Sequence, residues 1–446
     1  MSPSRLASCI TLPLENKKML NVIEKAKDWA LMHGVGMRDR KNFTKDAIQI
    51  APFVLLPSPF PRSEFYKALE LQTLLNELMH KVAHDVEFLS ETLQNALEVD
   101  EFTANLYNIW TTVRKEGITQ SIALGLFRSD YLLQGTDGIR QVEFNTIASS
   151  FGAVTTALPK MSRYVLKQLG HGDLVKNMPE NKALSGLCSG ITQAYDLFGA
   201  PDAVVIFVVE EVSYNICDQR FHEFEIAETS DGKPVAVVYY RSGYEPAQYP
   251  TSREWDARLR IERSSAIKCP SIQYQLAGTK KVQQALAVPG ALERLLGPNE
   301  GIPRIRNIFT GLFSLDFDES GEKAVEMAFV LKPQREGGGN NLYGADVRTA
   351  LTRMRNSKER AAYILMERIN PPVVAGYVVR ANAPVPPPLV DLVSELGIFG
   401  VVIGTKDKII CNKQVGHMLR TKLADADEGG VAAGLGALDS PYLIDL

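Results

Sequence analysis

The stretch FVLKPQREGGGNNLYG, residues 329–344, constrains the fold of this chain more than any other. An apolar run ends in Lys332 and Pro333, and a charged step leads into three glycines, two asparagines and a tyrosine. Adjacent glycines cost backbone entropy, so they indicate a place where the backbone curls tightly or approaches another group closely. The lysine and the polar side chains around them indicate that this group is a phosphate chain. We therefore expect an ATP-using enzyme rather than a flexible surface turn.

The glycine loop matches neither of two common nucleotide-binding motifs. No G-K-[ST] follows it at the spacing of a Walker A loop, and its contiguous glycines do not form the G-x-G-x-x-G of a Rossmann fold. The loop brings Glu336 close in sequence to the lysine that ends the preceding strand. A carboxylate beside a lysine suits phosphate and magnesium together.

The composition is that of an ordinary globular chain long enough for two or three domains. The net charge of −3 argues against a dedicated nucleic-acid binder, and no apolar run is long enough to span a bilayer. The N-terminal segment lacks the pattern of a signal peptide. The five cysteines are scattered without a C-x-x-C pair, which predicts reduced thiols in a cytoplasmic protein.

A helical apolar period in the first third changes to the period of strands after Ser121. Two strands joined by a polar turn are expected, and alternation places Glu143 and Asn145 on one face of the second. Later runs, DAVVIFVVEE and VAVVYY, predict buried strands of a parallel sheet. Arg241 and Tyr244 follow the second run, at the usual place for a ligand in an α/β domain.

Magnesium prefers oxygen ligands, often one or two carboxylates completed by phosphate and water. Glu143, Asn145 and Glu336 are the candidate ligands, although Glu143 and Asn145 fit a solvent-facing edge strand equally well. The segment RTK puts Arg420 and Lys422 on alternate positions, suited to a carboxylate and a phosphate, or to a solvated strand.

Six motifs together resemble eukaryotic glutathione synthetase: LKPQREGGGNNLYG, VEFNTIASSFG, FRSDY, QLAGTKKVQQ, SELGIFG and HMLRTK followed by GGVAAG. The resemblance spans most of the chain and the motifs keep their order. It implies an ATP-grasp ligase, a homodimer that joins γ-glutamylcysteine to glycine with ATP and Mg2+ through an acyl-phosphate. No nucleic acid or membrane is an expected partner.

The resemblance implies an α/β fold of the ATP-grasp type, with a helical N-terminal part, an inserted parallel-sheet substrate domain and a glycine-rich lid. The expected domains are residues 1–187, helix-rich with antiparallel strands, residues 188–290, the substrate domain, and residues 291–446, which include the lid at about 325–385.

Carried over position by position, the resemblance implies four sets of site residues. The catalytic residues would be Arg420, Lys332 and Arg128. The magnesium ligands would be Glu143, Asn145 and Glu336. The ATP site would comprise Glu143, Lys280, Lys332, Pro333, Gln334, Arg335, Glu336, Gly337, Gly338, Gly339, Asn340, Asn341, Tyr343, Met366, Glu367, Arg368, Ile369, Glu395, Lys422 and Glu428. The dipeptide and glycine site would comprise Arg128, Ile147, Ala148, Ser149, Ser150, Ser213, Tyr214, Asn215, Gln219, Arg241, Ser242, Gly243, Tyr244, Arg420, Val431 and Ala432.

Two positions depart from the family pattern. Ala148 stands where the family often has a serine, and the segment after Arg220 is much shorter than usual. A strand lost there would leave a gap or an exposed edge in the parallel sheet. This motivates an alternative, a non-catalytic or unstable variant that keeps nucleotide binding and dimerisation. A second alternative is a ligase for β-alanine or serine, although Val431 and Ala432 resemble the glycine-using pattern.

Overall fold

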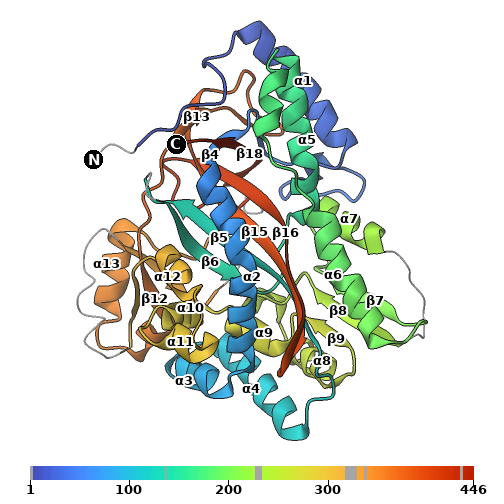
Figure 1. The fold of residues 1–446 in the computed structure, drawn as a ribbon, viewed down its shortest axis with the longest axis vertical. Coiled ribbons are helices and arrows are strands. Elements are labelled where there is room, and N and C mark those ends of the chain that lie inside the picture. Colours follow the sequence, from blue (N-terminus) through green and yellow to red (C-terminus); the bar gives the residue numbers. More distant parts are fainter. Residues whose placement is uncertain (1–3, 136–137, 227–233, 317–328, 336–338, 432–434) are drawn as a thin grey trace.

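The fold is built around one large, mostly antiparallel sheet (Figure 1). A computed structural model describes residues 4–135, 138–226, 234–316, 329–335, 339–431 and 435–446. The strands follow the order β14-β3-β17-β16-β15-β5-β6, and β13 also pairs with β15. Their bounds are β3 (Phe53–Val54), β5 (Ala123–Leu133), β6 (Ile139–Asn145), β13 (Val374–Gly376), β14 (Val378–Val379), β15 (Val390–Thr405), β16 (Lys408–Leu423) and β17 (Ala437–Asp439).

The long hairpin of β15 and β16 carries the centre of this sheet. Ile398 and Val402 of β15 belong to one core, whereas Phe399 and Val401 belong to the other. Because both faces of the strand are buried, its sequence is a nearly continuous apolar run. A sheet buried on both faces needs a helical layer on each side.

Helices supply these two layers (Figure 1). The helix α2 packs across one face of β15 and β16, while α5 and α6 pack against the other. Gly400 of β15 permits the close approach of α2, because a Cβ there would lie 2.3 Å from Oδ1 of Asn76. The helices of these layers are α1 (Asn16–Met32), α2 (Arg62–His84), α3 (Val86–Leu97), α4 (Glu101–Glu116), α5 (Gly152–Gln168) and α6 (Ala183–Phe198).

The predicted parallel sheet is present and consists of β7 (Val204–Val208), β8 (Val235–Tyr240) and β9 (Ile267–Cys269). β8 is buried as predicted, but the prediction of a buried strand is wrong for β7, which is only partly buried because it lies at the edge of the sheet. The helix α7 (Ile216–Ile226) follows β7, and residues 227–233 lie outside the described part of the chain. The expected gap is not found among the described strands, since β7 pairs directly with β8. The expected edge is found at β7, where the side chain of Ile206 is exposed.

A small antiparallel sheet carries the glycine loop. Its strands are β10 (Leu312–Ser314), β12 (Tyr363–Glu367) and β11 (Phe329–Pro333), in that order. The helix α13 (Gly344–Arg353) packs on this sheet through a core of its own. Along the chain, β11 is followed by the loop, by α13 and then by β12. Glu336, Gly337 and Gly338 lie outside the described residues.

The remaining elements connect and surround these sheets. They are β1 (Gly36–Met37), β2 (Gln49–Ile50), β4 (Ser58–Pro61), β18 (Pro441–Ile444), α8 (Ser252–Arg263), α9 (Ile272–Ala277), α10 (Lys280–Leu286), α11 (Ala291–Leu296), α12 (Ile302–Ile308), η1 (Gly172–Asn177), η2 (Pro246–Gln248) and η3 (Lys358–Ala362).

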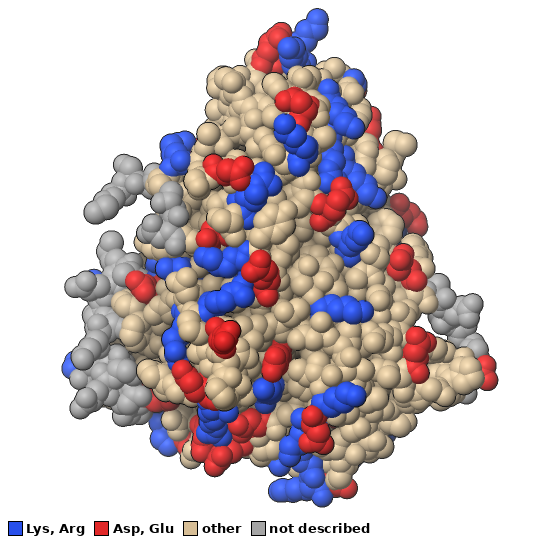
Figure 2. Space-filling model, in the orientation of Figure 1, with Lys and Arg blue, Asp and Glu red and all other residues tan. Residues whose placement is uncertain are grey.

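Acidic and basic side chains are interspersed over the face shown in Figure 2. Arg294, for example, pairs with Asp85 and Glu87. Among the described helices, none has both the length and the apolar character needed to cross a membrane.

Candidate active site

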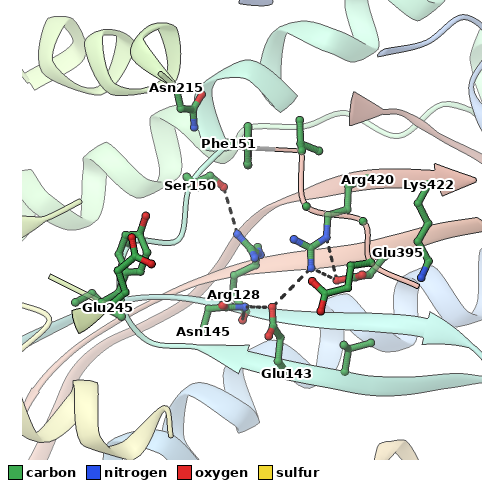
Figure 3. A pocket seen from close by; sticks show the side chains of 18 of the residues that line it. Arg128, Glu143, Asn145, Ser150, Phe151, Asn215, Glu245, Glu395, Arg420 and Lys422 are labelled. Atoms are coloured by element: carbon green, nitrogen blue, oxygen red, sulfur yellow. Dashed lines mark hydrogen bonds and ion pairs between the residues drawn. The ribbon is translucent and has the colours of Figure 1, made fainter. Parts of the chain in front are cut away.

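Charged residues converge where β5 and β6 run side by side (Figure 3). Arg128 lies opposite Asn145 across the two strands, and Asp130 lies opposite Glu143. The guanidinium of Arg128 binds both oxygens of Asp130, with Nε–Oδ1 and Nη2–Oδ2 distances of 2.6 and 2.8 Å. Both side chains are buried, so this bidentate ion pair holds the guanidinium of Arg128 in a fixed position in the site.

The neighbouring hairpin adds Arg420 and Glu395, which are cross-strand partners in β16 and β15. Nη2 of Arg420 binds Glu395, and it also lies 3.5 Å from Asp130 and 3.6 Å from Glu143. Although burial alone would lower the pKa of Arg420, the three surrounding carboxylates raise it. The guanidinium is therefore held at the centre of an acidic cluster formed by Asp130, Glu143 and Glu395.

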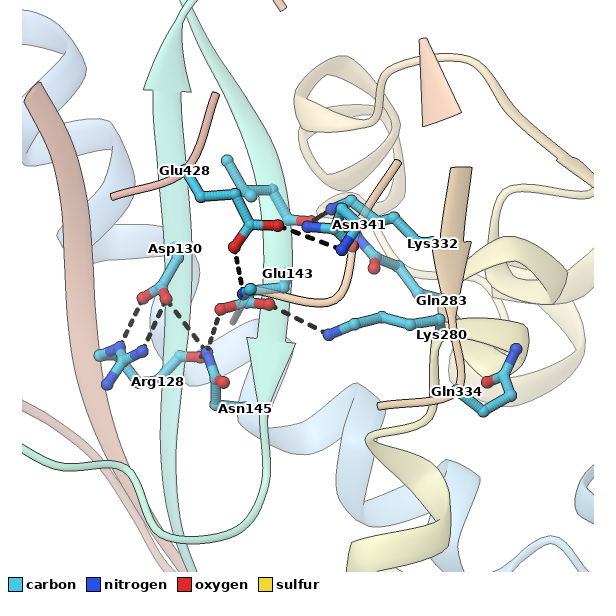
Figure 4. Close-up of polar contacts among 12 residues, drawn as sticks. Arg128, Asp130, Glu143, Asn145, Lys280, Gln283, Lys332, Gln334, Asn341 and Glu428 are labelled. Atoms are coloured by element: carbon cyan, nitrogen blue, oxygen red, sulfur yellow. Dashed lines mark hydrogen bonds and ion pairs between the residues drawn. The ribbon is translucent and has the colours of Figure 1, made fainter. Parts of the chain in front are cut away.

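Lysines approach the same cluster from the other side (Figure 4). Nζ of Lys280, the first residue of α10, lies 3.0 Å from Oε2 of Glu143. Burial would raise the pKa of Glu143, but Lys280, Arg420 and Lys332 hold it well below its usual range. Burial raises the pKa of Asp130 to about 6, against the opposing effect of Arg128. Nζ of Lys332 also donates to the carbonyl of Val142, at 2.9 Å.

The acidic cluster fits a divalent cation. Carboxylate oxygens of Asp130, Glu143 and Glu395 all lie within 4.8 Å of one another. Asn145, the predicted amide ligand, is adjacent, since its Nδ2 donates to Asp130 at 3.1 Å. Oxygen donors of this kind suit magnesium. Glu336, the third predicted ligand, lies outside the described residues.

The sequence did not single out Asp130 or Glu395 as metal ligands. Asp130 stands two positions from Arg128 in FRSDY, so strand alternation could have placed it on the same face of β5. Glu395 was expected in the ATP site, and only the register of β15 with its neighbours brings it to the cluster.

A cavity of about 300 Å3 adjoins the charged cluster (Figure 3). Its lining includes these residues predicted for the dipeptide and glycine: Arg128, Ile147, Ala148, Ser150, Ser213, Tyr214, Asn215, Gln219, Arg241, Tyr244, Arg420 and Val431. The lining also includes four charged residues that the sequence did not single out: Arg40, Glu210, Glu245 and Asp427.

Three predicted residues are buried beside this cavity without lining it. Ser149 donates to the carbonyl of Asn145 at 3.5 Å, and Ser242 and Gly243 lie in the buried turn after β8. Ala432 lies outside the described residues.

The loop before α5 is held in an unusual backbone conformation at the cavity wall. Ala148 and Phe151 have φ angles of +49° and +74°, which for residues other than glycine cost about 1 kcal/mol or more each. The buried carboxylate of Asp218 accepts from the N–H groups of Phe151 and Ala153, at 2.9 and 2.8 Å. Asp218 also binds Arg241 at 2.8 Å. One carboxylate thus holds the loop against α7 and the end of β8.

A second cavity, of about 610 Å3, opens between the small sheet and the central sheet. It is lined by these residues predicted for ATP: Lys332, Asn341, Tyr343, Met366, Glu367, Arg368, Ile369 and Lys422. Glu428 lines the first cavity and accepts hydrogen bonds from the N–H groups of Gly339 and Asn341 (Figure 4). This carboxylate ties the end of the glycine loop to the segment after β16.

Six described residues predicted for ATP line neither cavity, and they are Lys280, Pro333, Gln334, Arg335, Gly339 and Asn340. Gln334 is buried and accepts from the N–H of Lys281, whereas Arg335 pairs with Asp100. Pro333 ends β11, and Asn340 follows Gly339 in the loop.

The family model for the eukaryotic glutathione synthase ATP-binding domain matches residues 16–443. The chain belongs to the eukaryotic glutathione synthase family. Glutathione synthetase of Xenopus laevis is 42% identical over 456 residues, which cover 94% of this chain and 96% of the relative. The human protein of the same name is also 42% identical, over 96% of this chain and 98% of its own.

A solved structure agrees with the glutathione synthase fold. The glutathione synthetase-like effector of Globodera pallida has a TM-score of 0.77 and 25% identity, covering 97% of this chain and 98% of its own. This confirms the expected α/β fold of the ATP-grasp type. The two alternative functions are not favoured, because the curated relatives reported above are both glutathione synthetases.

Proposed function

We propose that this protein joins γ-glutamylcysteine to glycine with ATP, giving glutathione, ADP and phosphate. The observation that carries the proposal is that the two cavities share part of their lining. Lys332, Asn341, Tyr343 and Lys422 belong to both. A phosphate donor in the larger cavity and a carboxylate acceptor in the smaller one would therefore meet between two lysines. That juxtaposition suits transfer of a phosphoryl group to the cysteinyl carboxylate.

The cations at the junction have distinct roles in this proposal. Lys332 and Lys422 act as point charges on the phosphates, and the guanidinium of Arg420 binds the carboxylate that becomes the acyl-phosphate. Burial lowers the pKa of Lys422, and the carboxylates of Glu395 and Asp427 oppose this shift. The charge of the ammonium group therefore depends on these acidic neighbours. Arg128, the third residue predicted to be catalytic, would orient the substrate, because its ion pair with Asp130 holds its guanidinium in place.

Asp130, Glu143 and Glu395 would hold Mg2+, with Asn145 beside them and Glu336 supplied by the loop. When bound, the ion supplies charge neutralisation for the phosphate oxygens. Nη2 of Arg420 lies within 3.6 Å of a carboxylate oxygen of each of these three residues. We infer that the cluster binds a cation, because its three carboxylates already surround the guanidinium of Arg420.

Protection of the acyl-phosphate from water is assigned to the glycine loop. Glu428 holds the end of this loop over the junction through two backbone N–H groups. A closed loop excludes water, so the amine of glycine becomes the nucleophile. Gly339, Asn340 and Asn341 would border the ATP phosphates, together with Glu336, Gly337 and Gly338.

Three further expectations belong to this proposal. The domains are residues 1–187, 188–290 and 291–446, of which the second is supported by the separate parallel sheet β7-β8-β9. The protein works as a homodimer, as the resemblance implies, and sedimentation velocity tests this. A cytoplasmic location is supported by five cysteines that are all free.

The deciding experiment is a coupled assay of ADP release by the purified protein. We expect release to require γ-glutamylcysteine, glycine and magnesium together, with β-alanine and serine much poorer than glycine. Glutathione is measured in the same samples by thiol chromatography. If ADP release does not exceed that of the control without dipeptide, the proposed function is refuted. If the rate with β-alanine equals the rate with glycine, glycine is refuted as the preferred amine substrate.

A further inference from the structure

The end of the smaller cavity farthest from Lys422 is acidic, and the mechanism above makes no use of it. Figure 3 shows Glu245 at this end, with Arg128 and Arg420 between it and Lys422. Glu210 lines the cavity at the same end. Glu210 follows β7 and Glu245 follows β8, and these strands are parallel, so their carboxyl ends meet at one edge of the sheet.

One side chain brings the two carboxylates together. Nε2 of Gln248 donates to Glu210 at 2.8 Å and to Glu245 at 3.4 Å. Its Oε1 accepts from the N–H groups of Gly243 and Tyr244, at 2.6 and 2.9 Å. The amide therefore fixes both acids to the turn after β8. This turn is already tied to the dipeptide cavity through Arg241 and Tyr244.

The two carboxylates lack an ionic partner within the described part of the chain, where every Lys or Arg nitrogen is more than 4.0 Å away. Arg40, from another part of the chain, lines the same cavity and its charge lowers the pKa of Glu245, but its guanidinium lies over the ring of Tyr214. Burial and the charge of Glu210 together raise the pKa of Glu245. Two half-buried acids in a cavity favour a cationic ligand group.

We infer that Glu210 and Glu245 bind the α-ammonium group of the γ-glutamyl residue and so select dipeptides that carry it. The inference rests on the proposed function, which puts the cysteinyl carboxylate between Arg420 and the lysines. The γ-glutamyl residue then extends to the opposite end of the cavity. An ammonium group donates three hydrogen bonds, and the two carboxylates supply acceptors for them. The hydroxyl of Tyr244, which lies 3.4 Å from Oε1 of Glu210, is a further acceptor nearby.

The test compares γ-glutamylcysteine with N-glutarylcysteine, which is the same dipeptide without the α-amino group. We expect the wild-type protein to prefer γ-glutamylcysteine by roughly 10- to 100-fold in kcat/KM. Glu245→Gln and Glu210→Gln should each lose most of this preference through a higher KM for γ-glutamylcysteine. The KM for ATP should stay unchanged. Glu211→Gln is the matched control, because Glu211 is exposed and does not line the cavity.

Gln variants that keep the full preference would overturn the inference, as would a loss of activity that is equal for both dipeptides. The second result would mean that the acids serve Arg40 or the turn rather than the ligand. Calorimetric binding of the two dipeptides gives the same comparison without turnover. A wild-type protein that binds γ-glutamylcysteine selectively but forms no glutathione would refute the proposed reaction and support this inference.

Discussion

Asp439→Asn should change how the stability of the protein depends on pH. Asp439 is buried in β17, and its Oδ2 accepts from Ser58 Oγ at 2.5 Å and from Thr421 Oγ1 at 2.6 Å. Its Oδ1 accepts from the N–H of Ser440 at 2.7 Å. Burial raises the pKa of Asp439 to about 7, and these hydrogen bonds offset the rise only in part.

The direction of the effect follows from which state holds the proton. Between the ordinary carboxyl pKa of 3.8 and about 7, folded Asp439 keeps its proton while the unfolded chain loses it. The stabilisation is therefore complete below about pH 3.8 and is lost as the pH rises to 7. About three pH units at about 1.4 kcal/mol each correspond to about 4 kcal/mol.

Asparagine keeps the shape of the side chain and has no proton to lose in this range. The free energy of unfolding of Asp439→Asn relative to wild type should therefore rise by about 4 kcal/mol between pH 4 and pH 8. Urea unfolding of both proteins at several pH values measures this difference. Asp202→Asn is the control at an exposed site, and its difference should stay flat. A difference for Asp439→Asn that is equally flat would refute the reasoning.

Three further changes test other parts of the structure. Glu428→Ala removes an acceptor for two backbone N–H groups of the glycine loop. The ratio of ADP to glutathione should therefore rise above one, because water reaches the acyl-phosphate. An unchanged ratio would argue against a role of Glu428 in holding the loop closed. Gly416→Ala places a Cβ 2.6 Å from backbone atoms of Ala183 and should cost about 2–4 kcal/mol in thermal unfolding, whereas Gly199→Ala, with open space around it, should cost only about 1 kcal/mol. Glu143→Gln should raise the magnesium concentration needed for half-maximal turnover about tenfold or more, and an unchanged requirement would place the ion elsewhere.

Much of the architecture could be predicted from local sequence patterns. Alternation in VEFN predicted that Glu143 and Asn145 share a face, and in the structure Glu143 belongs to the acidic cluster while Asn145 lies beside it. The nearly continuous apolar run after Ser394 corresponds to β15, a strand that is buried on both faces. Such patterns succeed because burial repeats with the period of the backbone itself.

The shortened segment after Arg220 shows where such reasoning fails. Sequence comparison within a family predicts a missing strand, but it does not say which strands become neighbours. In the structure β7 pairs with β8 through hydrogen bonds between their backbones, so the gap closes and only an edge remains. Backbone pairing depends on spatial adjacency, which a deletion can preserve.

The sequence by itself determined the glycine loop, the periods of the strands and the family to which the chain belongs. Only the tertiary structure decided which charges meet. Asp130 and Glu395 lie more than 260 residues apart in sequence, yet the register of β5 with β15 brings both to Arg420. Glu210 and Glu245 converge because two parallel strands end at one edge. A charge acquires its role from its neighbours in space, since electrostatic interactions depend on distance and burial rather than on sequence separation.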